Sequence, residues 1–332
     1  MKKFMKGCAW TALILIVLGF ILALAAGTTK GAATIRDVVH NVTGGTVNVD
    51  LTELGDWGIS ISEGAEDLKD GVLDGIEGLE DTVNYEIEDS MIFNDSFEIF
   101  TGDVDMEFAQ EEITELDVEV GGCNFEVKES DDDKFYVEAE GTKKFQAYTR
   151  SGILVIKGTI KTVIGNNFSG NIVLRVPRGF TFEKVDMEIG AGVMELGNMS
   201  ADKLDMEVGA GQITADTLIA DTLNVAVGMG EAVINDMQVN KLDAEVGMGN
   251  FSGKGYAGEK VIVECAMGNV EMKLDGTSAD YDYDIECGMG NVTIGGNSYS
   301  GLANEKSINN GANRKMDVEC AVGNIDIRFS ED

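Results

Sequence analysis

Hydrophobic and polar residues alternate along most of the chain from about Ile113 onward. In the stretch LDMEV, residues 204–208, the three apolar side chains face one side of a strand and the two acidic side chains face the other. The same two-residue period occurs in LDVEVGGCNFEVKES, KFYVEAEG, ILVIKG and NIVLRVPRGF. This alternation predicts β-strands, and 42 glycines with one proline favour tight turns over long helices.

A repeat divides these strands into equal units. The segments VDMEIGAG, LDMEVGAG, LNVAVGMG, LDAEVGMG and VIVECAMG place a shared small residue 19 residues apart, at Gly190, Gly209, Gly228, Gly247 and Ala266. Further copies place it at Gly288 and Ala321, and a degenerate copy at Gly121. A fixed period near 20 is typical of stacked coils that cover each other's apolar faces. The sequence predicts an all-β fold, a single-stranded β-helix or solenoid with coils of about 19–22 residues, over residues 113–332.

Several columns of side chains follow from this repeat. The middle residue of the Gly-x-Gly turn is always apolar, and we expect it to form a core ladder of Ala191, Ala210, Met229, Met248, Met267, Met289 and Val322. The residue after the turn predicts a hydrogen-bonded ladder of Asn124, Asn250, Asn269, Asn291 and Asn324. Cys265, Cys287 and Cys320 share one position and are expected to be small core residues. The alternative is a disulfide between one adjacent pair.

The N-terminal region predicts a membrane anchor. Residues 9–26 carry no charge, would span about 27 Å as a helix, and follow Lys2, Lys3 and Lys6. We therefore expect a cytoplasmic basic tail at 1–8, a transmembrane anchor at 9–26, an acidic stalk or linker at 27–112 and an extracytoplasmic C-terminal body, in a single-pass cell membrane protein. The alternative is a signal peptide cleaved near Ala23–Ala25, which would make the protein secreted.

The charge balance limits the partners. Twenty-five basic and 59 acidic residues give a formal net charge of −34 and a pI near 4.2. Phosphate binding requires clustered Lys and Arg, so nucleic acid and anionic lipid are not expected as ligands. Cations, basic surfaces and cell-surface, peptide or protein ligands fit this charge.

The outward positions of the strands carry acidic columns. One interpretation is a binding face for a divalent cation such as calcium, because hard cations take carboxylate oxygens. Its candidate ligands are Glu188, Glu207, Glu245, Glu264, Asp186, Asp205 and Asp243. The other interpretation is a solvated face that keeps the sheet soluble, and Asp131–Asp133 is expected to be an exposed hairpin tip.

Catalytic chemistry has little support. His40 is the single histidine and lies outside the predicted solenoid, so Ser-His and Cys-His pairs are not expected there. Acidic residues recur on every coil without one distinct cluster, so we predict no catalytic or cofactor-binding residues and no enzyme. Residues 295–315 form a polar insertion that is either a passive excursion or a recognition loop.

The strings ITELDVEVGGCNFEVKESDDDKFYVEAEG and NIVLRVPRGFTFEKVDMEIGAG, with the LDMEVGAG repeats, resemble the bacterial adhesin-like β-strand-repeat family of unknown function. The resemblance covers roughly residues 113–332 and implies a β-helix, often behind a membrane anchor, with surface attachment or envelope stress as proposed roles. The first functional hypothesis is a membrane-anchored, extracytoplasmic, non-catalytic binding or adhesion module. The alternatives are an envelope-stress or regulatory ectodomain that senses cationic peptides or a signalling partner, and a carbohydrate-active β-helix enzyme.

Overall fold

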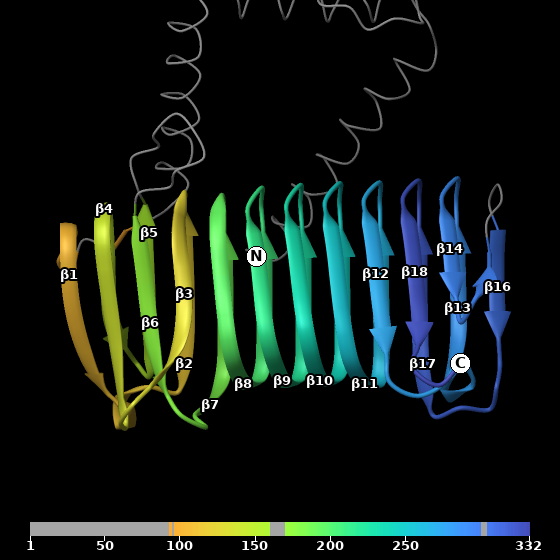
Figure 1. Ribbon diagram of the computed structural model, residues 1–332, viewed down its shortest axis with the longest axis horizontal. Helices are drawn as coiled ribbons and strands as arrows, with labels where there is room; N and C mark the ends of the chain where they lie inside the picture. The colour runs from red at the N-terminus through yellow and green to blue at the C-terminus, as the bar shows by residue number, and fades with distance from the viewer. Residues whose placement is uncertain (1–92, 95, 160–169, 300–303) are drawn as a thin grey trace, which may run out of the picture. The chain divides into compact units, whose positions relative to one another are not determined.

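The computed structural model describes residues 93–94, 96–159, 170–299 and 304–332, and these fold almost entirely as β-strands. They form one 18-stranded sheet that winds into a solenoid (Figure 1). Two short 3-10 turns, Gln110–Glu112 and Ser278–Asp280, interrupt it. The strands are β1 (Phe100–Ala109), β2 (Glu115–Gly121), β3 (Cys123–Ser130), β4 (Lys134–Arg150), β5 (Ile153–Thr159), β6 (Asn171–Pro177), β7 (Thr181–Ile189), β8 (Gly192–Val208), β9 (Gln212–Val227), β10 (Glu231–Val246), β11 (Asn250–Cys265), β12 (Asn269–Leu274), β13 (Tyr281–Cys287), β14 (Asn291–Ile294), β15 (Asn297–Ser298), β16 (Asn304–Ile308), β17 (Arg314–Cys320) and β18 (Asn324–Phe329).

Each regular coil consists of two strand segments joined by a Gly-x-Gly or Ala-x-Gly turn. We call the segments that lead into these turns, together with β2 and β5, which pair with each other and with β7, the first face: β2, β5, β7, the C-terminal halves of β8 to β11, β17 and β13. The segments that leave the turns, together with β3 and β6, form the second face: β3, β6, the N-terminal halves of β8 to β11, β12, β18 and β14. Equivalent residues of neighbouring coils pair in parallel, as Leu204 with Leu223 and Val246 with Cys265 do. The predicted all-β solenoid is confirmed.

The core lies between the two faces. Leu204, Met206 and Val208 are at most 2% exposed, whereas Asp205 and Glu207 lie on the outer side of the same strand. Alternate residues of the other strands continue this pattern and form one hydrophobic cluster. Because successive coils cover each other's apolar rows, the core extends along the stack of coils.

The second glycine of each turn permits the close stacking of coils. A Cβ added at Gly249 would lie 2.2 Å from the carbonyl oxygen of Gly230 in the preceding coil, and a Cβ at Gly268 would lie 2.2 Å from that of Gly249. No side chain fits at this distance, so this position is glycine in each regular coil. The first position of the turn can also hold a methyl side chain, since Ala266 and Ala321 occupy it.

The spatial order of the coils differs from their order in the chain. The coil of β2 and β3 lies between the coil of β5 and β6 and the coil of β7 and β8. At the other end, β17 and β18 lie between β11 with β12 on one side and β13 with β14 on the other (Figure 1). The last coil along the chain, near Ile325–Phe329, is therefore not at the end of the stack. Its backbone is paired on both sides.

Antiparallel strands cover both ends of the stack. β1 pairs with β4, and β4 pairs with β5 and β6, so the sheet begins before the predicted boundary at residue 113. The boundary was missed because Val104, Met106 and Phe108 alternate with acidic residues that resemble the stalk composition. At the other end, the insertion 295–315 supplies β15 and β16, which pair with β14 and β13. This insertion covers a sheet edge that would otherwise be open.

The predicted tail, anchor and most of the stalk, residues 1–92, lie outside the described residues, as does His40. Within the described part of the chain, no helix is long and apolar enough to cross a membrane. The transmembrane helix at 9–26 therefore stays a prediction.

Candidate functional site

The first face carries two columns of carboxylates. The parallel register places Asp186 beside Asp205 and Glu188 beside Glu207, and Glu245 beside Glu264. Glu264 in turn neighbours Glu319, which neighbours Glu286. We call Glu119, Glu188, Glu207, Glu245, Glu264, Glu319 and Glu286 the glutamate column. The aspartate column consists of Asp117, Asp186, Asp205, Asp243, Asp317 and Asp284. Each predicted acidic residue lies in its expected column.

Both columns contain breaks. Ala226 lies between Glu207 and Glu245, and Asn224 lies between Asp205 and Asp243. Asn224 donates a 2.5 Å hydrogen bond from Nδ2 to Oδ1 of Asp205. The register also pairs Asp243 with Ile262. The carboxylate surface is therefore a set of short runs.

A column of lysines, which the sequence analysis missed, lies beside the aspartate column and pairs with Asp186, Asp205 and Asp317. Lys184, Lys203, Lys241, Lys260 and Lys315 lie two residues before the aspartate position, with Thr222 in the remaining regular coil. The Nζ atom of Lys203 lies 2.6 Å from Oδ2 of Asp205, and that of Lys260 lies 3.0 Å from Oδ2 of Asp317. Lysine recurs two residues before most of these aspartates, so the signal was present in the sequence.

The glutamate column lacks such a lysine column. Lys157 forms an ion pair with Glu119 at one end. Elsewhere in the described part of the chain, Glu245 and Glu264 form no ion pair. Partial burial raises the pKa of both carboxyls above the usual range, and repulsion from neighbouring carboxylates raises each further. The negative charge of the first face is therefore concentrated beside the turns.

The apolar residues at the middle of the turns form an exposed ridge. The side chains of Met229, Met248 and Met289 are 64%, 42% and 69% exposed, and that of Val322 is 41% exposed. We call Met229, Met248, Met267, Val322 and Met289, in spatial order, the methionine ridge. The prediction that this column belongs to the core is wrong. The residue projects outward because the glycines on either side of it stack against the neighbouring coils.

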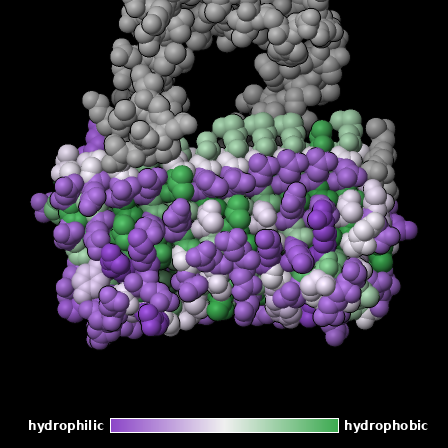
Figure 2. Space-filling model, viewed as in Figure 1, coloured by the Kyte–Doolittle hydropathy of each residue, from purple (hydrophilic) through white to green (hydrophobic). Residues whose placement is uncertain are grey.

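Figure 2 shows apolar side chains in a row along one edge of the stack. The backbone N–H of Met248 donates to the Gly228 carbonyl at 2.8 Å, and that of Met289 donates to the Ala321 carbonyl at 2.7 Å. Equivalent bonds join the other turns of the ridge. Because these N–H groups are already paired, the ridge offers mainly thioether and aliphatic surface.

The second face begins with the predicted amide ladder. Asn269 donates from Nδ2 to Oδ1 of Asn250 at 3.0 Å, and Asn324 donates to Asn269 at 3.0 Å. Asn124 instead bonds to Asn171 on β6, and Asn291 accepts from the Ser298 hydroxyl. The ladder is confirmed for its central members and replaced by local partners at the ends.

The cysteines lie in the core as predicted. Cys265, Cys320 and Cys287 occupy neighbouring strands in that order and are buried and free of disulfides. The thiols of Cys265 and Cys320 donate to the carbonyls of Gly268 and Gly323 at 3.2 and 3.1 Å. Burial raises the pKa of Cys123, at the start of β3, to about 12. The Cys123 thiol is therefore a poor nucleophile.

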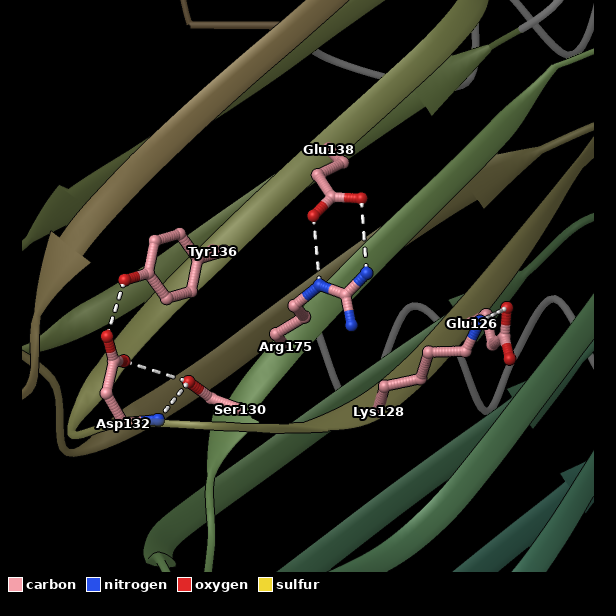
Figure 3. A network of polar contacts seen from close by, with 7 residues as sticks. All are labelled: Glu126, Lys128, Ser130, Asp132, Tyr136, Glu138 and Arg175. Carbon is pink, nitrogen blue, oxygen red and sulfur yellow. Dashed lines mark hydrogen bonds and ion pairs between the residues drawn. The ribbon is translucent and has the colours of Figure 1, made fainter.

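The acidic tip Asp131–Asp133 is exposed, but it is a connection rather than a hairpin. It joins β3 to β4, and β6 lies between these strands. Asp132 accepts hydrogen bonds from the Tyr136 hydroxyl at 2.8 Å and the Ser130 hydroxyl at 3.0 Å (Figure 3). The bond from Tyr136 lowers the pKa of this carboxyl. Nearby, Arg175 donates to both carboxylate oxygens of Glu138 at 2.9 and 3.5 Å, which joins β6 to β4. These contacts are structural.

The predicted cation ligands do not converge on a point. Within the described residues, no group of three or more His, Cys, Asp or Glu side chains is placed to hold a metal ion. A hollow is found instead where the chain bends between the faces, lined by Arg178, Phe180, Met199 and Ile219 among others. Its two basic lining residues are already paired: Arg178 with Glu129 at 3.0 Å, and Lys128 with Glu126 at 2.6 Å.

A family model matches residues 149–328, just over half of the chain. The chain belongs to the Toastrack DUF4097 family. The matched range begins at the end of β4 and includes the regular coils, the insertion and most of β18. The predicted relationship to a β-strand-repeat family of unknown function is therefore confirmed. No curated protein matches the chain.

Solved structures resemble the Toastrack DUF4097 chain at low identity. A putative adhesin from Bacteroides fragilis is 14% identical, with 69% of this chain and 97% of that chain covered and a TM-score of 0.38. A putative lipid binding protein from Parabacteroides distasonis is 14% identical, with 68% and 98% covered and a TM-score of 0.41. A putative cell adhesion protein from Clostridium sporogenes is 12% identical, with 69% and 100% covered and a TM-score of 0.32.

Proposed function

We propose that the chain is a non-catalytic binding or adhesion module, anchored to a membrane by residues 9–26, with its solenoid presented outside the cytoplasm. The observation that carries the proposal is the repetition of identical side chains along the outer surface of the coils. The lysine, aspartate and glutamate columns and the methionine ridge all follow the parallel register. A repeated, rigid surface suits multivalent contact with an extended ligand.

The arrangement of polar groups supports a binding role over catalysis. Catalysis requires a nucleophile, acid or base with a distinct environment, held beside groups that stabilise charge. Here the aspartate–lysine pairs of successive coils have similar surroundings, as Lys203–Asp205 and Lys260–Asp317 show. The Cys265 and Cys320 thiols are buried and bonded to carbonyl oxygens. The raised pKa values of Glu245 and Glu264 follow from partial burial first and from repulsion by neighbouring carboxylates second.

A regulatory ectodomain is the second candidate function. The carboxylates of Glu245 and Glu264 beside the turns favour it, because such a surface attracts basic peptides. A carbohydrate-active enzyme is the third alternative from the sequence, and no described side-chain cluster favours it.

Two measurements test the proposed function. In cells expressing the full chain, we expect it in the membrane fraction, and protease added to spheroplasts should remove the solenoid. Protection of the solenoid, or recovery of the chain in the soluble cytoplasm, contradicts the proposed location. The detergent-purified full chain should retain ligands from arrays of glycans, peptides and envelope proteins without changing them. Release of products from a polysaccharide would instead indicate an enzyme.

A further inference from the structure

The methionine ridge exposes more apolar surface than solubility requires. Met187, Met194, Met237 and Met316 are fully buried, so methionine serves as a core residue elsewhere in the same solenoid. On the ridge, by contrast, successive turns expose thioether side chains to solvent. Contiguous apolar surface with a polar border is typical of an interaction site. Unbranched thioethers also adapt to partners of different shape.

The polar border of the ridge is asymmetric. On the first-face side, the glutamate column lies three residues before the ridge position. On the second-face side, Glu231 lies beside Met229, and Asn250, Asn269 and Asn324 continue the same row as an uncharged ladder. The lysines lie farther from the turn, and among the described residues no ion pair joins them to Glu245 or Glu264; Lys203 and Lys260, for example, pair with Asp205 and Asp317. From Met248 to Val322, the edge therefore offers an apolar stripe whose negative charge is greater on the first-face side, where Glu245, Glu264 and Glu319 lie.

We propose that the methionine ridge and the glutamate column together bind an amphipathic helix that carries basic residues along one border of its apolar stripe. This inference rests on the proposed binding function and specifies its partner. The helix lies along the ridge, across the direction of the strands. Its apolar side chains contact the methionines, and its basic groups pair with Glu245, Glu264 and Glu319.

The spacing of the coils fits a helix. The five turns from Met229 to Met289 are separated by four intervals of about 4.8 Å, so this part of the ridge is ~19 Å long. A helix repeats every ~5.4 Å and places one apolar group near each turn of the solenoid, and ~13 residues span this length. An extended peptide repeats its side chains on one face every ~6.6 Å and fits less well.

The charge distribution disfavours two other occupants. A second copy of this chain would bring one glutamate column toward another, in a protein with a net charge of −34. An anionic membrane would be repelled for the same reason. A basic amphipathic helix gains from both the ridge and its acidic border.

Fluorescence anisotropy with the detergent-purified full chain tests the inference. The probe is a labelled 14-residue helix of leucine and lysine, with lysine along one border of the leucine face. A peptide of the same composition in scrambled order controls for charge alone. We expect the helix to bind at least tenfold more tightly than the scrambled peptide. Equal affinity for the two peptides would overturn the proposal.

Variants then locate the site. Met229→Gln, Met248→Gln and Met289→Gln together should weaken binding of the helix about tenfold, because they remove the exposed apolar contacts. Glu245→Gln with Glu264→Gln should weaken it about threefold and reduce its salt dependence. Unchanged affinity in either set would overturn the proposal.

Matched controls separate the site from the general charge and hydrophobicity of the protein. Ile219→Gln removes an exposed apolar side chain at the bend away from the turns, and Glu195→Gln with Glu271→Gln removes two charges from the second face. All three substitutions should leave affinity within twofold of the wild type. An equal loss in these controls would overturn the proposal, as would ridge-dependent binding to phosphatidylglycerol or phosphatidylcholine vesicles without binding of the helix.

The two proposals fail in different ways. If only the helix inference is wrong, the ridge variants retain every ligand that the wild-type chain takes from the arrays. If the binding function itself is wrong, neither the wild-type chain nor the ridge variants retain any ligand from the arrays.

Discussion

Replacing Gly249 with alanine provides a direct test of the stacking that underlies the whole surface. The new Cβ would lie 2.2 Å from the Gly230 carbonyl oxygen and 2.7 Å from Cγ1 of Val227. Ordinary contact begins near 3.4 Å, so the two coils must move apart by about 1.2 Å, a quarter of the ~4.8 Å between strands. Both obstacles belong to the preceding coil, and one of them is backbone. The coil therefore cannot relieve the clash by rotating a side chain.

The expected cost follows from the contacts that this movement disturbs. The Asn250 N–H donates to the Gly230 carbonyl at 3.0 Å, and the Gly249 N–H donates to the Gly228 carbonyl at 3.0 Å. Weakening two such bonds costs about 2 kcal/mol. Overpacking against Val227 adds about 1–3 kcal/mol. We expect Gly249→Ala to lower the free energy of unfolding by about 3–5 kcal/mol.

Urea denaturation followed by circular dichroism measures this change. Gly190→Ala is the matched control, because a Cβ there meets its nearest atom, the Val120 carbonyl oxygen, at 3.9 Å. The control should remain within about 1 kcal/mol of the wild type. If Gly249→Ala is also within 1 kcal/mol, the coils do not stack as described.

Three further predictions concern charge, cations and coil order. Glu245→Gln with Glu264→Gln should stabilise the solenoid at pH 7. The pKa of each carboxyl is raised in the folded state, so each contributes its full stability below about pH 4.5 and loses it as the pH rises through the pKa of the folded state. The neutral glutamines do not carry this cost at pH 7. Thermal melts from pH 4 to 8 check this, and a gain that persists at pH 4 would contradict it. Millimolar calcium should leave the thermal midpoint unchanged, since Asp205 and Asp317 already pair with lysines and no group of three acidic side chains among the described residues is placed to hold an ion. A rise of several degrees would restore the cation interpretation. Deleting residues 314–332 should cause unfolding or aggregation, because the deletion exposes the edges of β11, β12, β13 and β14. Light scattering and circular dichroism measure this. Results that match those of the full chain would contradict the position of β17 and β18 between these strands.

The repeat predicted the solenoid well because its physical signals are local. Alternation in LDMEV sets the two sides of each strand, and the fixed spacing of Gly190, Gly209 and Gly228 sets the register between coils. The amide ladder and the buried cysteines follow from the same register. No long-range information is needed for these features.

The ridge was misassigned because strand alternation does not continue through a turn. Met229 and Met248 are apolar, which suggested burial, but each lies between two glycines that stack against a neighbouring coil and leave the intervening side chain outside. The order of the coils was not predictable from the repeat either. Copies such as Cys287 and Cys320 are equivalent in sequence, so either could neighbour Cys265.

Methionine oxidation tests the central claim, the exposure of the ridge, most directly. The folded full chain is treated briefly with hydrogen peroxide, which converts a thioether to a sulfoxide and is itself reduced to water, and peptides are analysed by mass spectrometry. Met229, Met248 and Met289 should be oxidised at least tenfold faster than Met194 and Met237, while circular dichroism stays unchanged. Equal rates, or protection of the ridge in the folded protein, would contradict the account.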